Sequence, residues 1–199
     1  WWNVPADRQP KSSHRPATAR VFFALWPPAE VADRLAAIAD EAAARFGGRA
    51  TRRETIHLTL AFLRDVPVSR LDELGEVAAS VQGAAFDLSL DRLGFWQHNH
   101  LLWAGGETPA ALTALHGVLS AALVGNGFKV DGEGRNFAPH VTLVRKLPPT
   151  CRLAPRQEMP MPALSWSCQR FFLVRSRLSS SGSEYLILRD FLLTSTHIA

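Results

Sequence analysis

Thr55-Ile-His-Leu-Thr-Leu-Ala-Phe-Leu63 is the most informative segment of this 199-residue chain. Apolar side chains alternate there with His57 and Thr59, which is the two-residue period of a strand with one polar face. A second stretch, Phe137-Ala-Pro-His-Val-Thr-Leu-Val-Arg145, repeats the pattern around His140 and Thr142. One His-aliphatic-Thr-Leu motif is a weak signal, but two copies in one chain indicate a shared site.

The residue types in the two motifs suit the cleavage of a cyclic phosphodiester. If the two strands face each other across a cleft, two imidazoles and two hydroxyls surround one small anion. An imidazole with a pKa near 6.5 serves as base in one protonation state and as acid in the other, so one neutral and one protonated histidine form a matched pair. Thr59 and Thr142 can donate to phosphate oxygens. This chemistry requires no metal and no cofactor.

Arg145 follows the second motif and is a candidate to stabilise a phosphorane-like transition state by its charge. Its parity along the strand is opposite to that of His140 and Thr142, unless a bulge or the strand end reorients it. A solvated cation at a strand end is the competing interpretation. A lone strand histidine is likewise often only a half-buried polar group, and it is the repetition that favours function.

The remaining periodicity predicts an α+β fold with two antiparallel-rich lobes rather than a doubly wound sheet. Residues 1–19 mix proline, serine and charge and are predicted to form a disordered leader, with the folded domain spanning 20–199. The patterns predict helices over 29–46, 67–81 and 108–124, and strands over 20–25, 55–63, 86–96, 100–104, 137–146, 166–178 and 184–193, with a proline-rich linker over 148–162.

Composition narrows the class of protein. A 47% hydrophobic content is enough for a buried core, while no apolar run and no signal pattern indicates a membrane or secretory protein, so a cytoplasmic monomer is expected. Cys151 and Cys168 fit neither a disulfide framework nor a metal-binding pair. The formal charge of +4, carried mainly by arginine, suits a phosphate-bearing partner, although a GC-rich genome would produce the same usage.

On these motifs the chain resembles the 2H phosphoesterase superfamily, specifically the RNA 2′,3′-cyclic phosphodiesterases that are also called 2′-5′ RNA ligases. The resemblance covers residues 20 to about 193. It includes the opening strand Arg20-Val-Phe-Phe-Ala-Leu25, both motif stretches, and a closing Ser176-Arg-Leu followed by Gly182-Ser-Glu-Tyr185.

The resemblance implies two pseudosymmetric lobes of antiparallel sheet with outer helices around a central cleft. It implies hydrolysis of a 2′,3′-cyclic phosphate, at an RNA or oligonucleotide end or on a cyclic nucleotide, to a 2′-phosphomonoester. His140 would be the proton acceptor and His57 the proton donor, labels that a symmetric site exchanges in the reverse reaction. Thr59, Thr142 and Arg145 would bind the phosphate.

Two departures from the family pattern lie near the expected rim of the cleft. Arg64 follows Phe62-Leu63 where the family often has glycine, and an Arg52-Arg53 region replaces a common aromatic residue. These arginines are candidates to grip an RNA backbone, although exposed loop arginines are usually only solvated.

Three alternatives remain open. The first is a nucleotide-binding or RNA-binding module of the same fold without turnover, which would not need a paired acid and base. The second is a metal site formed by His57, His140 and the pair His98-x-His100, for which no Cys, Asp or Glu completes a recognisable set. The third is the same chemistry on another cyclic phosphate, on ADP-ribose or tRNA fragments, or in the direction of ligation.

Overall fold

The computed structural model describes residues 17–149, 151, 159–179 and 182–194, so most of the predicted leader lies outside the described residues. Within the described residues nine strands form one sheet in the order β7-β4-β5-β6-β3-β1-β8-β9, with β2 paired to β6. The strands are β1 Thr18–Leu25, β2 Arg49–Ala50, β3 Leu58–Pro67, β4 Phe86–Trp96, β5 Leu101–Gly105, β6 Val141–Arg145, β7 Met159–Cys168, β8 Arg170–Ser179 and β9 Gly182–Leu192. The helices are α1 Ala29–Phe46, α2 Leu71–Ala79 and α3 Ala110–Gly125, with short 3-10 turns η1 Arg53–Thr55, η2 Val68–Arg70 and η3 Gln97–Asn99.

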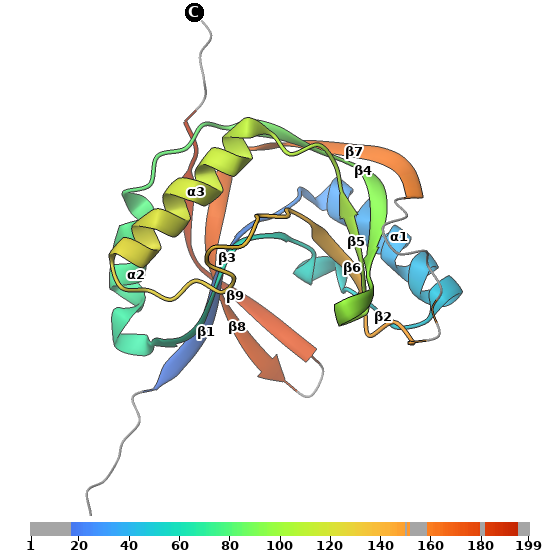
Figure 1. Cartoon of the computed structure of the whole chain (residues 1–199), viewed down its shortest axis with the longest axis horizontal. Helices are drawn as coiled ribbons and strands as arrows, with labels where there is room; N and C mark the ends of the chain where they lie inside the picture. The colour runs from blue at the N-terminus through green and yellow to red at the C-terminus, as the bar shows by residue number, and fades with distance from the viewer. Residues whose placement is uncertain (1–16, 150, 152–158, 180–181, 195–199) are drawn as a thin grey trace, which may run out of the picture.

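The sheet consists of two antiparallel halves that meet where β3 lies beside β6. One half is β3-β1-β8-β9 and the other is β6-β5-β4-β7, and every pairing between these strands is antiparallel. Helix α3 packs on β3 and α2, while α1 packs on β2, β6 and β7, so each half carries its own helices on the outside (Figure 1). The predicted α+β class with two antiparallel-rich lobes is confirmed.

Helix α1 has the predicted bounds because a proline, whose φ is fixed, precedes it and a glycine, which can adopt positive φ, ends it. Pro28 caps its start, and Gly47 ends it with φ of +80°, a region that side chains rarely adopt. The predicted helix over 67–81 is shorter, since β3 continues to Pro67 and residues 68–70 form η2 before α2 begins.

Three strand predictions were wrong in extent. The strand predicted over 55–63 runs from Leu58 to Pro67, because residues 53–55 form η1, and His57 therefore lies just before the strand. Strand β6 covers only five residues, because Phe137 stacks on the ring of His116 and Pro139 has no N–H to donate to a ladder. The long strand predicted over 166–178 is two strands that change partner at Gln169, since β7 pairs with β4 whereas β8 pairs with β1 and β9. Strand β1 begins at Thr18, and Ala19 is already buried in the core.

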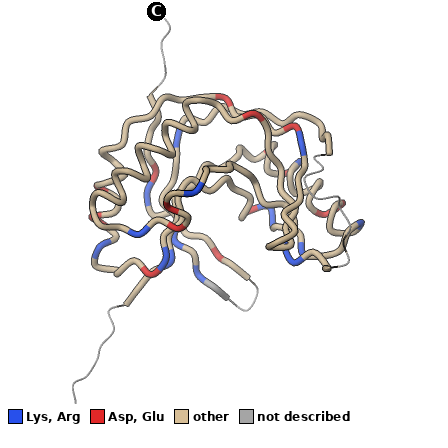
Figure 2. Tube along the Cα trace, in the orientation of Figure 1, with Lys and Arg blue, Asp and Glu red and all other residues tan. Residues whose placement is uncertain are grey.

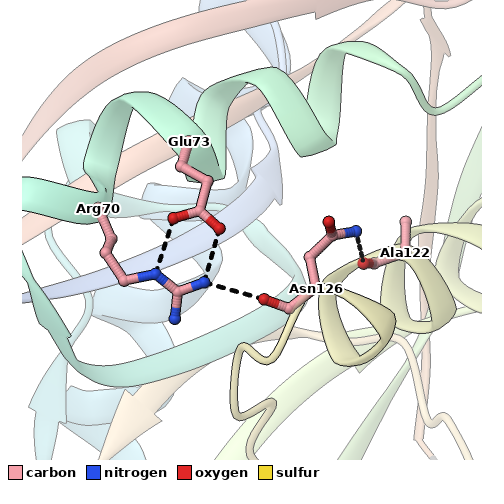
Figure 3. Close-up of polar contacts among 4 residues, drawn as sticks. All are labelled: Arg70, Glu73, Ala122 and Asn126. Atoms are coloured by element: carbon pink, nitrogen blue, oxygen red, sulfur yellow. Dashed lines mark hydrogen bonds and ion pairs between the residues drawn. The ribbon is translucent and has the colours of Figure 1, made fainter.

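A polar clamp joins the start of α2 to the end of α3 (Figure 3). Arg70 donates to both carboxylate oxygens of Glu73, at 2.8 and 2.7 Å, and to the main-chain oxygen of Asn126 at 2.9 Å. The Asn126 side chain donates in turn to the carbonyl of Ala122 at 2.8 Å. The clamp fixes the two helices against each other outside the first half of the sheet.

One hydrophobic core runs through both halves, and a smaller cluster of Phe22, Ala24 and Val174 lies on the other face of β1 and β8. Trp26 and Tyr185 pack against this smaller cluster. Among the described residues no helix is long and apolar enough to cross a membrane. Lysine and arginine positions are spread over both halves of the sheet and are not gathered on one of them (Figure 2).

Candidate active site

A single register pair brings the two motifs together. Leu58 lies opposite Val141 where β3 meets β6, and both side chains are buried. In an antiparallel pair the neighbours of this position cross, so His57 lies opposite Thr142 and Thr59 opposite His140. These four side chains project from the face opposite to Leu58 and Val141. The two tripeptides therefore form one four-residue cluster.

Each motif strand contains a bulge just after its threonine. Between Ala24↔Thr59 and Phe23↔Ala61 the register skips Leu60, and between Trp103↔Thr142 and Leu102↔Val144 it skips Leu143. The burial pattern around the bulge is the same in β3 and β6: the bulged leucine and the residue after it are both buried.

The bulge in β6 returns Arg145 to the face that carries Thr142, because one extra residue shifts the alternation by one position. Arg145 lines the same pocket as His57 and Thr142. The bulge therefore places Arg145 on the face of Thr142, although strict alternation along the strand predicts the opposite face. In β3 the equivalent shift turns Phe62 toward the face of Thr59, where the Arg20 guanidinium lies 4.8 Å from its ring centroid.

His57 is held by a hydrogen bond at each ring nitrogen. Nδ1 lies 2.7 Å from the main-chain oxygen of Thr55, and since a carbonyl only accepts, Nδ1 carries the proton. Nε2 lies 3.1 Å from Thr59 Oγ1 and accepts from that hydroxyl in the neutral ring.

Aromatic rings surround His57. Trp26 stacks on it at 5.3 Å between centroids and 18° between planes, Phe22 lies at 4.8 Å, and Tyr185 meets it edge-on at 5.4 Å. The burial they impose lowers the pKa of His57 to about 4, helped by the charges of Arg145 and His140 and opposed by the Thr55 carbonyl.

His140 has a matching arrangement. Its Nδ1 donates to the carbonyl of Ala138 at 2.9 Å, again the residue two positions earlier, and Trp96 meets the ring edge-on at 4.4 Å. Burial lowers the pKa of His140, the Ala138 carbonyl opposes this, and the charge of Arg145 adds to it. Both histidines thus keep the proton on Nδ1 and present Nε2 for proton transfer.

A pocket of about 120 Å³ adjoins the cluster on the His57 side. Burial lowers the pKa of Arg145 there, against the favourable influence of Tyr185. His140 and Thr59 do not line this pocket. Its lining residues are Arg49, Ala50, Thr51, Arg52, Thr55, His57, Thr142, Arg145, Gly182, Ser183 and Tyr185.

The arginines singled out at the rim have other partners. Arg53 forms an ion pair with Asp33, and Arg64 forms one with Asp131 at 2.8 Å. Arg52 lines the pocket, where it donates to the carbonyl of Ser183 at 2.5 Å.

The proposed metal ligands do not gather. Among the described residues no group of three or more His, Cys, Asp or Glu side chains is arranged to hold a metal ion. His98 instead lies beside Trp96, with ring centroids 6.2 Å apart, at the turn between β4 and β5. His100 adopts φ of +52°, which ends that turn.

The sequence motifs mark neither the aromatic residues around the two histidines nor Arg49. Trp26 follows the strand predicted over 20–25, and Trp96 ends the strand predicted over 86–96. Tyr185 appeared only in the family resemblance. Their role depends on strand packing, and no local pattern marks it.

Comparison with known proteins agrees with this geometry. The RNA 2′,3′-cyclic phosphodiesterase of Escherichia coli K12 is 29% identical over 181 residues, which cover 88% of this chain and 97% of that protein. The enzyme of the same name from Thermus thermophilus is 29% identical over 187 residues, covering 89% and 92%. The crystal structure of Escherichia coli LigT complexed with 3′-AMP matches with a TM-score of 0.79 at 27% identity, covering 89% of this chain and 99% of that one. The family profile of the 2′-5′ RNA ligase superfamily matches residues 27–179, and the protein therefore belongs to this superfamily.

Proposed function

We propose that the protein hydrolyses a 2′,3′-cyclic phosphate, at an RNA end or on a nucleotide, to a 2′-phosphomonoester by a two-histidine mechanism. The Leu58–Val141 register pair carries this proposal, because it brings the two His-x-Thr motifs side by side. Relatives over most of the chain carry the name RNA 2′,3′-cyclic phosphodiesterase, and the related LigT structure was obtained with 3′-AMP.

In the proposed reaction Nε2 of His140 removes a proton from water as the water oxygen attacks phosphorus. The bond between phosphorus and the 3′-oxygen breaks, and Nε2 of His57 gives its proton to that oxygen. Thr59 and Thr142 donate to non-bridging oxygens, and Arg145 balances the charge that develops on them. Each step uses side chains of the chain itself and needs no metal or cofactor.

The protonation states fit a site that is completed by its substrate. Both histidines have a lowered pKa, so in the free protein the pair is neutral at pH 7. A bound phosphate anion favours the imidazolium form and raises both pKa values. Substrate binding thus favours the protonated form of His57, which is the form that acts as the acid.

Two further features belong to the proposal. With a 5′-hydroxyl RNA end in place of water, the same proton transfers would form a bond from the 5′-oxygen to phosphorus as the 3′-oxygen departs, which is 2′-5′ ligation. We also propose that the protein acts as a cytoplasmic monomer. Cys151 and Cys168 are both free, which suits a reducing compartment, and burial raises the pKa of Cys168 to about 12, which leaves it unreactive.

Incubation with 2′,3′-cyclic nucleotides and with cyclic-phosphate-ended RNA, in the presence of EDTA, tests the function. We expect a 2′-phosphomonoester, identified by phosphorus NMR. His57→Ala and His140→Ala should each reduce kcat/KM by about 10²- to 10⁴-fold, as for loss of a general acid or base. His98→Ala is the matched control and should retain activity.

Each alternative has its own result in this assay. Tight nucleotide binding without product would indicate a binding module. Loss of turnover with EDTA would favour a metal site. A single histidine variant with the wild-type rate would contradict the two-histidine mechanism.

A further inference from the structure

Two arginines face each other across the edge of the candidate site. Arg49 of β2 is the register partner of Arg145 of β6, and both line the pocket beside His57. Like charges directly opposite each other in an antiparallel pair are destabilising. A bound anion between them would remove this repulsion.

Among the described residues no side chain supplies such an anion. Within the described residues no carboxylate lies at ion-pair distance from Arg49 or Arg145, although six other arginines have acidic partners: Arg52, Arg53, Arg64, Arg70, Arg170 and Arg189. The repulsion between Arg49 and Arg145 is therefore not offset by a carboxylate of the described residues.

The position of Arg49 suits a ligand inside the pocket. Its Nη1 lies 4.0 Å from the place where a Cβ on Gly182 would stand, so the guanidinium reaches from β2 to the start of β9. In the same wall the hydroxyl of Thr51 is buried and has no hydrogen-bond partner among the described residues. Both groups are donors available to an oxyanion.

The proposed reaction defines which part of the substrate lies there. If His57 protonates the departing 3′-oxygen, the ribose lies on the His57 side of the phosphorus, because attacking and leaving oxygens are opposed. The pocket that His57 lines continues from that side to Arg49. The next phosphate along an RNA strand is the one attached to the 5′-oxygen of the same ribose.

We propose that Arg49, opposite Arg145 and beside Thr51, forms a second phosphate subsite that binds the phosphate on the 5′ side of the terminal ribose. This inference rests on the proposed function. It makes the substrate a nucleotide that carries a 5′ phosphate, as every RNA end longer than one nucleotide does. A cyclic nucleotide with a free 5′-hydroxyl leaves the subsite empty.

Three substrates test the subsite in the wild-type protein: adenosine 2′,3′-cyclic phosphate, its 5′-phosphorylated form, and a diadenosine dinucleotide that ends in the cyclic phosphate. We expect kcat/KM to be about tenfold higher for both 5′-phosphate-bearing substrates, since one charge-assisted contact gives about that factor. Equal values for all three would overturn the subsite while leaving cyclic phosphate hydrolysis intact. A gain only for the dinucleotide would assign the preference to the added nucleoside and would also overturn it.

Variants of Arg49 test whether this residue causes the preference for a 5′ phosphate. Arg49→Gln should reduce the ratio of kcat/KM between the 5′-phosphorylated and the 5′-hydroxyl substrate to about one, and Arg49→Lys should retain part of it because the charge remains without the planar fork. Arg34→Gln removes an equal charge from the exposed face of α1 and should keep the wild-type ratio. An undiminished ratio in a folded Arg49→Gln protein would contradict the proposal.

Binding separates the subsite from the reaction. By calorimetry the wild-type protein should bind adenosine 2′,5′-bisphosphate about tenfold more tightly than adenosine 2′-monophosphate, and Arg49→Gln should lose this difference. If this result holds but no substrate is hydrolysed, the subsite stands and the proposed function fails. Equal affinity of the wild-type protein for both nucleotides would overturn the subsite, whatever the activity.

Discussion

His116 donates a hydrogen bond from Nδ1 to the main-chain oxygen of Leu60, at 2.9 Å. Leu60 is the bulged residue of the first motif strand, and its carbonyl is thereby paired with a side chain of α3. The His116 ring also stacks on the ring of Phe137, with the ring centroids 3.8 Å apart and 5° between the planes. One side chain thus contacts the first motif strand and the segment that leads into the second motif.

Replacing His116 by alanine should lower the free energy of unfolding by about 2–4 kcal/mol, because a buried carbonyl loses its donor and Phe137 loses a stacked ring. His116→Phe keeps a ring and removes the donor, so its loss should be smaller. Urea unfolding with a common m-value measures both. An alanine variant with an unchanged midpoint would show that the contact does not stabilise the fold.

Trp26→Ala should raise the pKa of His57 from about 4 toward its ordinary 6.5, because water gains access to a ring that Trp26 now covers. An NMR titration of the His57 ring in both proteins measures the change. A His57 pKa that stays near 4 would assign the shift to the other rings or to Arg145.

Acid should destabilise the protein through the same group. The folded-state pKa of His57 lies below the ordinary value, so the folded protein favours the neutral ring. Its contribution to stability is complete above pH 6.5 and is lost as the pH falls from 6.5 to about 4. Unfolding midpoints across this range should fall less steeply in His57→Gln, which cannot titrate.

The pH dependence of catalysis follows from both histidines. Productive free enzyme needs one protonated and one neutral ring, and both pKa values are lowered. Therefore kcat/KM should already be declining at pH 6.5 and should fall by about tenfold per unit above it, whereas the decline of kcat should lie at higher pH because the bound anion raises the pKa values. A flat kcat/KM from pH 7 to 8.5 would contradict the need for an imidazolium.

Arg145→Ala should reduce kcat by about 10²- to 10³-fold, the cost of removing one group that stabilises transition-state charge. Arg145→Lys should recover part of the loss. If the variant changes only KM, Arg145 contributes to ground-state binding and not to the chemical step.

The sequence by itself determined the features that depend on one segment. The repeated alternation around His57 and His140 identified the four motif residues and the face they share. Pro28 and Gly47 determined the ends of α1, and strand β4 had its predicted bounds. Each of these follows from local periodicity or from the dihedral limits of single residues.

Only the tertiary structure decided how those segments meet. Alternation along one strand cannot show the bulges at Leu60 and Leu143, since a bulge is defined against a partner strand, and without it Arg145 would face the core. The change of partner at Gln169 was hidden because apolar residues continue on both sides of it. The low pKa of His57 and the opposition of Arg49 to Arg145 arise between residues far apart in the chain. Register, burial and charge are relations between segments, and the folded core establishes them.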